Sequence, residues 1–168
     1  MLPGWSWKIF LQENPDINPN QEHVWGNPVL IKFWSEYREK IAFGKVKDKA
    51  PETLEGLINK GYRVDLLTAR PLDKYAKLKH KLVEHLENLG IKYNFLNLGF
   101  HSKKEFLKEH NYNVLIDNDM KHIEEAESVG VTPILFGINP EYNGYQTDNW
   151  EEIPIIIQKI VEEKSKII

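Results

Sequence analysis

One apolar run of this sequence is followed by a hydroxyl group and a basic side chain. In VDLLTARP, Thr68 ends the run, and Ala69 and Arg70 come directly after it. If the run is a strand that turns into a helix here, the Thr68 hydroxyl and the backbone N–H groups can bind a phosphate oxygen. The alternative is structural, because Thr is a common cap at the start of a helix.

An acidic cluster follows a second apolar run. The stretch NVLI leads into Asp117, Asn118 and Asp119. Carboxylate and amide oxygens suit a hard cation such as Mg²⁺, which takes few protein ligands and keeps several waters. Asp119 also fits a purely structural role, as the cap of the helix expected over MKHIEEA. The sequence leaves both interpretations open.

The third candidate is a lysine at the start of a short predicted helix. In HSKKEF, Ser102 is a suitable helix cap and Lys103 falls in the first turn. A cation at a helix N-terminus opposes the helix dipole, so Lys103 is slightly unfavourable for the helix itself. That misfit hints at a function. The alternative is a solvated surface lysine.

These clusters are positioned by elements that alternate between helix and strand after residue 49. Pro51 marks a helix start, and Gly61 and Gly90 mark helix stops. The alternation predicts an α/β fold with a mostly parallel sheet, helices on both faces and ligands at the carboxyl ends of the strands. The expected strands are 63–68, 91–98, 113–117 and 132–137, and the expected helices are 50–61, 72–88, 103–110, 122–130 and 150–163.

The first part of the chain differs in composition from the rest. Through Asn27 it is rich in Trp, Pro and Asn, which predicts irregular surface structure, whereas the apolar spacing over 28–43 predicts a helix. We therefore expect residues 1–45 to form a small N-terminal cap or arm segment. Residues 46–168 are expected to form the α/β core of what is overall a single domain.

The composition of the whole chain narrows the function classes. With 168 residues and 41% hydrophobic and 28% charged content, it has the make-up of an ordinary soluble domain. A net charge of -3 offers no basic field for a nucleic acid polymer, so a small polar ligand is expected. Without Cys there are no disulfides. No apolar run approaches the ~20 residues of a membrane span, which predicts a cytoplasmic protein without a membrane partner. Homo-oligomerisation stays open.

Thr, Lys and acidic residues thus follow successive strands in that order, and the segments around them resemble a known family. LLTARP, HSKKEF, and VLIDND followed by KHIEEAESVG are similar to motifs II, III and IV of the haloacid dehalogenase superfamily. The run from Phe33 to Trp150 resembles its 5'(3')-deoxyribonucleotidase branch and related bacterial and phage nucleotidases.

This resemblance implies a haloacid-dehalogenase-like Rossmannoid fold and Mg²⁺-dependent hydrolysis of a nucleoside 5'-monophosphate. It implies a catalytic role for Lys103, with Lys104 as the substitute if the register slips, and it leaves open whether Asn118 or Asp119 completes the metal site. The residues that it assigns are Thr68, Ala69, Arg70 and Lys103 to the phosphate group and Asp117, Asn118 and Asp119 to Mg²⁺.

The chain departs from this family at the attacking group. Members open with an apolar strand that ends in DxDGT or DxDGV, and no segment here matches that pattern. The nearest stretch, WKIFLQENPD, has Gln12 and Asn14 at the two Asp positions, and neither side chain can form an acyl phosphate. Three accounts stay open: an incomplete chain, a relative that binds phosphate without hydrolysing it, or a strand supplied by another chain.

Two further functions compete with hydrolysis. A non-catalytic nucleotide- or phosphate-binding regulatory protein would keep the phosphate site without turnover. An interaction module would use the aromatic front, which includes Trp5, Trp7 and Trp25, to contact a partner. The module predicts no binding of phosphate or metal at all.

Overall fold

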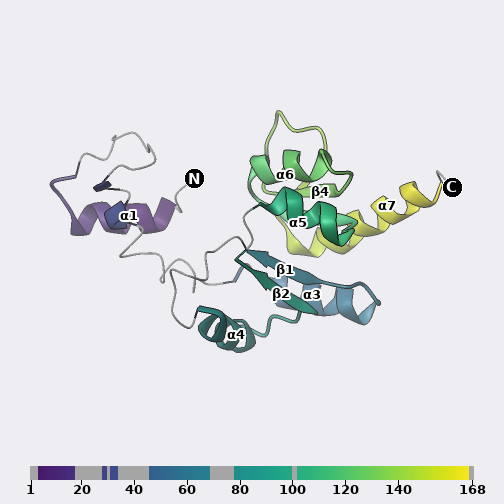
Figure 1. The fold of residues 1–168 in the computed structure, drawn as a ribbon, viewed down its shortest axis with the longest axis horizontal. Coiled ribbons are helices and arrows are strands. Elements are labelled where there is room, and N and C mark those ends of the chain that lie inside the picture. The colour runs from purple at the N-terminus through teal and green to yellow at the C-terminus, as the bar shows by residue number, and fades with distance from the viewer. Residues whose placement is uncertain are drawn as a thin grey trace. The chain divides into compact units, whose positions relative to one another are not determined.

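The computed structural model describes residues 4–17, 28–29, 31–33, 46–68, 78–99 and 102–166. The chain divides into two compact units, Met1–Lys45 and Val46–Ile168. Figure 1 shows the elements of both, and each unit is described by itself.

The first unit contains a helix where the sequence predicted irregular structure. α1 spans Gly4–Glu13, and Phe10 within it is fully buried. The turn-rich text begins only at Asn14, whose side-chain amide donates a hydrogen bond to the Phe10 carbonyl at 2.9 Å. The prediction of irregular structure was therefore wrong for residues 4–13. The stretch WSWKIFLQE, which follows Gly4, contains no Pro or Gly that would interrupt a helix.

A pair of aromatic rings forms the described core of this unit. Residues 28–29 and 31–33 are helical, as the apolar spacing predicted, and the rest of the helix expected over 28–43 lies outside the described residues. The ring of Phe33, also fully buried, lies edge-on to that of Phe10, with centroids 5.3 Å apart. Such a pair adds about 0.5–1.5 kcal/mol to the free energy gained by burying the two rings.

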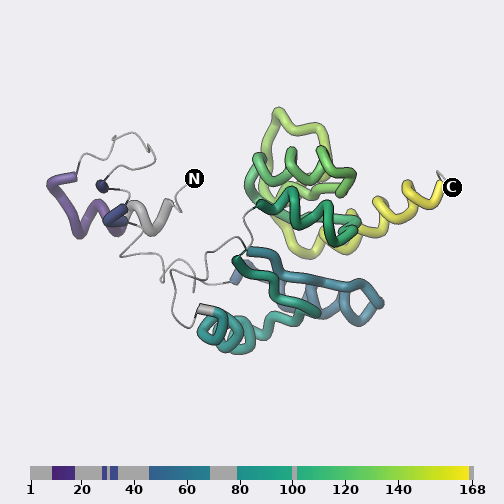
Figure 2. The backbone as a smooth tube through the Cα atoms, viewed as in Figure 1, coloured from purple at the N-terminus to yellow at the C-terminus, as the bar shows by residue number. Residues whose placement is uncertain are grey.

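The second unit alternates helices and strands, as predicted. Figure 2 follows its backbone from the blue of α3 to the yellow of α7. Its elements are α3 (Ala50–Asn59), β1 (Asp65–Thr68), α4 (Leu78–Asn88), β2 (Phe95–Leu98), α5 (Lys103–His110), β3 (Val114–Asp117), α6 (Met120–Glu127), β4 (Thr132–Phe136), β5 (Tyr145–Thr147), the 3-10 helix η2 (Trp150–Glu152) and α7 (Ile153–Ser165).

The helix boundaries follow from the residues that the sequence marked. Pro51 lies at the start of α3, where its missing N–H costs no helical hydrogen bond. Gly61 and Gly90 follow α3 and α4 with φ of 88° and 70°, a backbone conformation that glycine adopts without strain. The part of the expected helix before residue 78 lies outside the described residues.

The strands form two parallel sheets. β1 pairs with β2, from Asp65 opposite Phe95 to Thr68 opposite Leu98. In the other sheet β4 lies between β3 and β5 and is parallel to both. The prediction of a mixed α/β fold with parallel strands is confirmed, but the single expected sheet is present as two, because no ladder joins β1 to β3 in the described part of the chain.

The fifth strand was not predicted. β5 is only three residues long, and it follows the turn-rich text GINPEYNG. A run this short shows no alternation of apolar and polar residues, so it gives no strand signal. Its pairing with β4, from Ile134 opposite Tyr145 to Phe136 opposite Thr147, is what makes it a strand.

Helices cover both faces of the β3–β4–β5 sheet. On one face Ile134 and Phe136 of β4 pack with residues of α3 and α7, and Val114 and Ile116 of β3 pack against the same cluster. On the other face Leu115 of β3 packs with residues of α5 and α6. β1 reaches the second cluster through Leu67. The alternation of side chains along β3 therefore divides the core into two layers.

None of the helices in the described ranges is both long and apolar enough to cross a bilayer.

Candidate functional site

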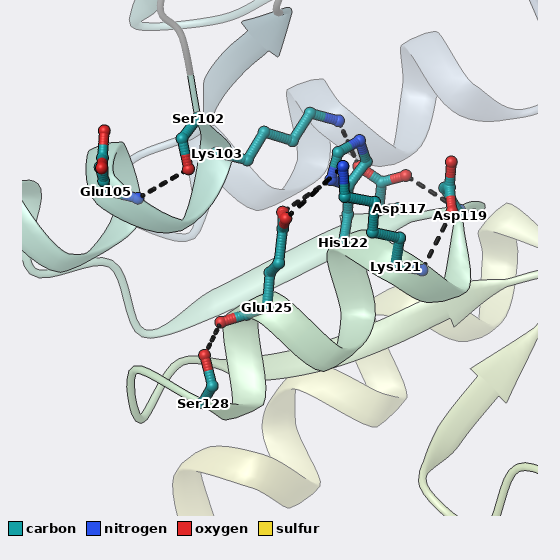
Figure 3. Close-up of polar contacts among 9 residues, drawn as sticks. All are labelled: Ser102, Lys103, Glu105, Asp117, Asp119, Lys121, His122, Glu125 and Ser128. Atoms are coloured by element: carbon teal, nitrogen blue, oxygen red, sulfur yellow. Dashed lines mark hydrogen bonds and ion pairs between the residues drawn. The ribbon is translucent and has the colours of Figure 1, made fainter. Parts of the chain in front are cut away.

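The site is built around an ion pair between two of the predicted residues. Asp117 is the last residue of β3 and Lys103 is the first residue of α5. Figure 3 shows the Lys103 side chain extending toward Asp117. The Lys103 Nζ lies 2.5 Å from the Asp117 Oδ2. Their side chains are only 13% and 9% exposed, so the pair is largely shielded from solvent. The interpretation of Lys103 as a solvated surface lysine is therefore wrong.

Local packing explains why these two residues meet. The Ser102 hydroxyl accepts a hydrogen bond from the Glu105 backbone N–H at 3.3 Å, which caps α5 and sets its first residue as Lys103. One turn later, Leu107 is buried in the same cluster as Leu115 of β3. Because Leu115 precedes Asp117 by two residues, packing of α5 on β3 brings its first turn to the carboxyl end of that strand.

The neighbouring lysine, Lys104, does not form the ion pair with Asp117. Lys104 is exposed, whereas the Lys103 side chain points to Asp117. The ion pair with Asp117 therefore involves Lys103, and the assignment of this lysine to a phosphate group stays a prediction. A lysine near a helix N-terminus is unfavourable for the dipole, and here a carboxylate compensates that cost.

In the acidic cluster, Asp117 is ion-paired and Asp119 caps a helix. The Asp119 backbone N–H donates to the Asp117 Oδ1 at 3.0 Å. The Asp119 carboxylate accepts from the Lys121 backbone N–H at 3.0 Å and caps α6. Asn118, between them, is exposed. Asp119 therefore has the structural role that the sequence left open.

The end of β3 offers a hard cation only a few oxygen ligands. Each Asp117 oxygen accepts one hydrogen bond, and a carboxylate oxygen has a second lone pair available. Among the described residues there is no group of three or more His, Cys, Asp or Glu that could hold a metal ion. Mg²⁺ needs no such group, because one or two carboxylates, waters and ligand phosphates complete its shell. Asp117 fits that chemistry together with Asn118 or with the Asp119 oxygen that does not cap α6.

Thr68 lies at the carboxyl end of β1, as predicted. It is half-buried and stands opposite Leu98 of β2. Ala69 and Arg70 lie outside the described residues, so the turn that would hold a phosphate oxygen is not described. The described contacts do not join Thr68 to the Lys103–Asp117 pair.

Gln12 and Asn14, which take the positions of the two Asp residues in the family's first motif, do not follow a strand. Gln12 lies within α1, and the Asn14 side chain bonds back to the Phe10 carbonyl at the end of that helix. WKIFLQENPD is therefore a helix end followed by a turn. It does not present two side chains at the carboxyl end of a strand.

A second polar cluster, at the opposite end of the strands, was not predicted. Asp65 begins β1, and its side chain is 2% exposed. Its Oδ2 accepts bonds from the Arg63 Nε and Nη2 at 2.9 and 2.7 Å and from the Tyr112 hydroxyl at 2.6 Å. Because Tyr112 lies two residues before β3, this cluster, the Arg63–Asp65–Tyr112 cluster, links the amino ends of β1 and β3.

The pKa values of this cluster follow from its burial and hydrogen bonds. Burial alone would raise the pKa of Asp65, but the hydrogen bonds from Arg63 and Tyr112 outweigh it and hold the pKa below its usual value. Burial, with the hydrogen bond to Asp65, raises the pKa of Tyr112 to about 12. The spacing of Arg63 and Asp65 places both on one face of a strand, which was the available sequence signal. Tyr112 lies 47 positions after Asp65, and no sequence signal indicated that the two residues would meet.

Another pair missed from the sequence lies on α6 and joins its first turn to its second. The His122 Nδ1 is 3.0 Å from the Glu125 Oε2, and the Lys121 Nζ is 3.9 Å from the other oxygen of Glu125. Figure 3 shows this pair on the helix that follows Asp117. The sequence signal was the i, i+3 spacing, which places both side chains on one helix face.

No protein-family model and no curated protein matches this sequence.

Proposed function

We propose that the chain binds a phosphate monoester at the carboxyl ends of β1 and β3 and is a haloacid-dehalogenase-like, Mg²⁺-dependent phosphatase of the 5'-nucleotidase type. The observation that carries the proposal is the shielded contact of Lys103 with Asp117. A lysine and a carboxylate from separate elements, held together where a parallel strand ends, are suited to a ligand that brings both negative charge and a divalent cation.

Each of these residues has a definite part in binding, whereas the carboxylate that attacks phosphorus in the family has no counterpart in this sequence, so hydrolysis would need that group from elsewhere. The Lys103 ammonium donates hydrogen bonds to phosphate oxygens and neutralises their charge, which is worth about 1.5–3 kcal/mol for a charged hydrogen bond. The Thr68 hydroxyl donates to another oxygen of the same group. Asp117, with Asn118 or Asp119, would hold Mg²⁺, which when bound would neutralise further phosphate charge and polarise the phosphorus–oxygen bonds.

The shielding of the pair matters for this chemistry. In a site with little water, a charge interacts more strongly with a phosphate group than it does in bulk solvent. Lys103 is held in place by Asp117 before any ligand arrives, so binding does not have to order a flexible side chain. A phosphate oxygen would then accept a hydrogen bond from one of the ammonium hydrogens that Asp117 does not use.

The experiment that tests the proposal is phosphate release from a panel of ribo- and deoxyribonucleoside 5'-monophosphates, with Mg²⁺ and with a chelator. Mg²⁺-dependent release that Asp117→Asn abolishes is the expected result. Release that persists unchanged in the chelator, or in Asp117→Asn, would remove the metal and Asp117 from the reaction.

A second candidate is a protein that binds the phosphate monoester without hydrolysing it. The observation that favours it is the placement of Gln12 in a helix, because the apolar run before it offers no strand-end carboxylate to attack phosphorus. The same panel separates the two candidates. Nucleotide binding with no phosphate release supports this one.

A further inference from the structure

The helix that follows Asp117 carries a histidine whose ring is oriented by a carboxylate. The His122 Nδ1 lies 3.0 Å from the Glu125 Oε2, and the two side chains are 22% and 23% exposed. The hydrogen of this bond belongs to the ring nitrogen, because an ionised carboxylate can only accept. In the neutral ring the other nitrogen, Nε2, then carries no hydrogen and can accept a proton. Glu125 therefore prepares His122 as a base.

The position of His122 on α6 places it on the side of α5. Ala126 and Val129 pack in the same core cluster as Leu107 of α5. His122 lies four residues before Ala126 and seven before Val129, a spacing that puts all three on one face of the helix. His122 therefore lies on the face of α6 that packs against α5, one turn before Ala126.

Lys103 lies at the matching level of α5. It precedes Leu107 by four residues and so lies on the same helix face. Both helices begin at the carboxyl end of β3, since the first turn of α5 reaches Asp117 and α6 starts just after it. They run in the same direction, and Lys103 and His122 each lie one turn before the residues that pack together. Figure 3 shows both side chains extending toward the end of β3.

A phosphate group on Lys103 would therefore lie within reach of the His122 ring. Helices that pack on each other are about 8–10 Å apart, a distance that facing side chains bridge from both sides. The charged groups around the ring are Glu125 and Lys121 on its own helix and the Lys103–Asp117 pair across from it. Both oxygens of Asp117 already accept hydrogen bonds. The imidazole is the group best prepared to take a proton here.

We propose that His122 is the general base of this site, and that Glu125 is a positioning residue that holds its ring. The inference rests on the proposed function. His122 Nε2 takes a proton from a water molecule, and the water oxygen forms the new bond to phosphorus as the bond to the nucleoside oxygen breaks. The departing oxygen takes a proton from solvent, and His122 returns its own to solvent. Water thereby replaces the attacking carboxylate that the sequence lacks.

The test is phosphate release from thymidine 5'-monophosphate by the full chain, with nucleotide affinity measured in parallel by calorimetric titration. We expect His122→Gln to slow release by roughly 10²–10⁴-fold and to change the affinity by less than about twofold. His110→Gln is the matched control. The His110 Nδ1 is also bonded, to the Phe106 carbonyl at 2.9 Å, but this residue is exposed at the last position of α5. The control should change neither quantity.

A spectroscopic measurement on the parent chain tests the orientation of the ring without a substitution that could disturb folding. Nitrogen NMR shifts, recorded at a pH where the ring is neutral, should show the His122 hydrogen on Nδ1. We expect Glu125→Gln to move part of the population to the other tautomer and to slow phosphate release by roughly 10–100-fold. A residue with a merely structural role would not change the tautomer.

The outcomes separate this inference from the proposed function. Phosphate release that His122→Gln leaves unchanged, or release and affinity that fall by the same factor, overturns the base and leaves the proposed function standing. A His122 ring with its hydrogen on Nε2 in the parent chain also overturns it. Nucleotide binding without release by the parent chain overturns the base and hydrolysis together. No nucleotide binding by the parent chain overturns the proposed function, and this inference with it.

Discussion

The second unit contains two carboxylates, Asp117 and Asp65, that are shielded in similar degree but differ in what surrounds them. The Asp117 side chain has one cationic partner and lies at the carboxyl end of its strand, next to exposed Asn118. One oxygen of Asp65 accepts hydrogen bonds from the Arg63 guanidinium and the Tyr112 phenol, and Asp65 lies at the amino end of its strand. Ligands of parallel sheets bind at carboxyl ends, which is why the proposal gives binding to Asp117, whereas we expect Asp65 to contribute to stability.

The pH dependence of folding should report on Asp65. Because its folded pKa lies below the usual value of 3.8, its contribution to stability is present above that value and is lost as the pH falls through the folded pKa. We expect Asp65→Asn to lower the free energy of unfolding at neutral pH by about 1–3 kcal/mol. The difference from the parent protein should shrink in acid. Denaturant titrations across that pH range measure it.

Tyr112→Phe is the matched control for Asp65→Asn. It removes one of the hydrogen bonds to the Asp65 carboxylate and leaves the Arg63 bonds in place, so a smaller loss with the same pH trend is expected. It should also abolish one phenol titration with a midpoint of about 12. A loss that is constant between neutral and acid pH would show that Asp65 does not stabilise through its charge.

At the scale of elements, the cap of α5 determines where Lys103 lies. Removing the Ser102 hydroxyl leaves the Glu105 backbone N–H without its partner. We expect Ser102→Ala to lower the free energy of unfolding by about 0.5–2 kcal/mol and to weaken phosphate binding, since the first turn of α5 would fray. Thermal unfolding and calorimetric titration measure the two effects.

Ser165 offers a control at the other end of the unit. Its hydroxyl donates to the Val161 carbonyl within α7 and is exposed, far along the sequence from the site. We expect Ser165→Ala to change stability by less than about 0.5 kcal/mol and phosphate binding not at all. Equal effects of the two substitutions would mean that the cap does not position Lys103.

The helices and strands were largely predictable from the sequence, whereas the side-chain contacts between them were not. Pro51, Gly61 and Gly90 gave local signals for helix ends, and four strands had apolar runs long enough to recognise. β5 and α1 were missed because one is three residues long and the other carries no strong helical pattern before turn-rich text. The resemblance assigned Lys103 to the phosphate group and Asp117 to Mg²⁺, but it did not predict that the two side chains contact each other. The contact of Asp65 with Tyr112 depends on tertiary packing, which spacing does not reveal.

At the scale of the whole molecule, the described cores of the two units are built from different residues. Phe10 and Phe33 pack on each other in the first unit, and Ile157 belongs to the core cluster of the second. We expect Phe10→Ala, which costs about 3–5 kcal/mol in a packed core, to reduce amide protection in α1 and leave α7 unchanged. Ile157→Ala should do the reverse. Loss of protection in both helices from either substitution would show that the units unfold together.

The central claim is that Lys103 binds the phosphate group of a small ligand, and calorimetric titration tests it most directly. The titrants are thymidine 5'-monophosphate and thymidine, each with Mg²⁺, against the parent chain, Lys103→Met and the exposed-neighbour control Lys104→Met. We predict binding of the nucleotide and much weaker binding of the nucleoside, with a loss of about tenfold to a hundredfold in Lys103→Met only. Equal affinity for both titrants, or a nucleotide affinity that Lys103→Met leaves unchanged, would contradict the account.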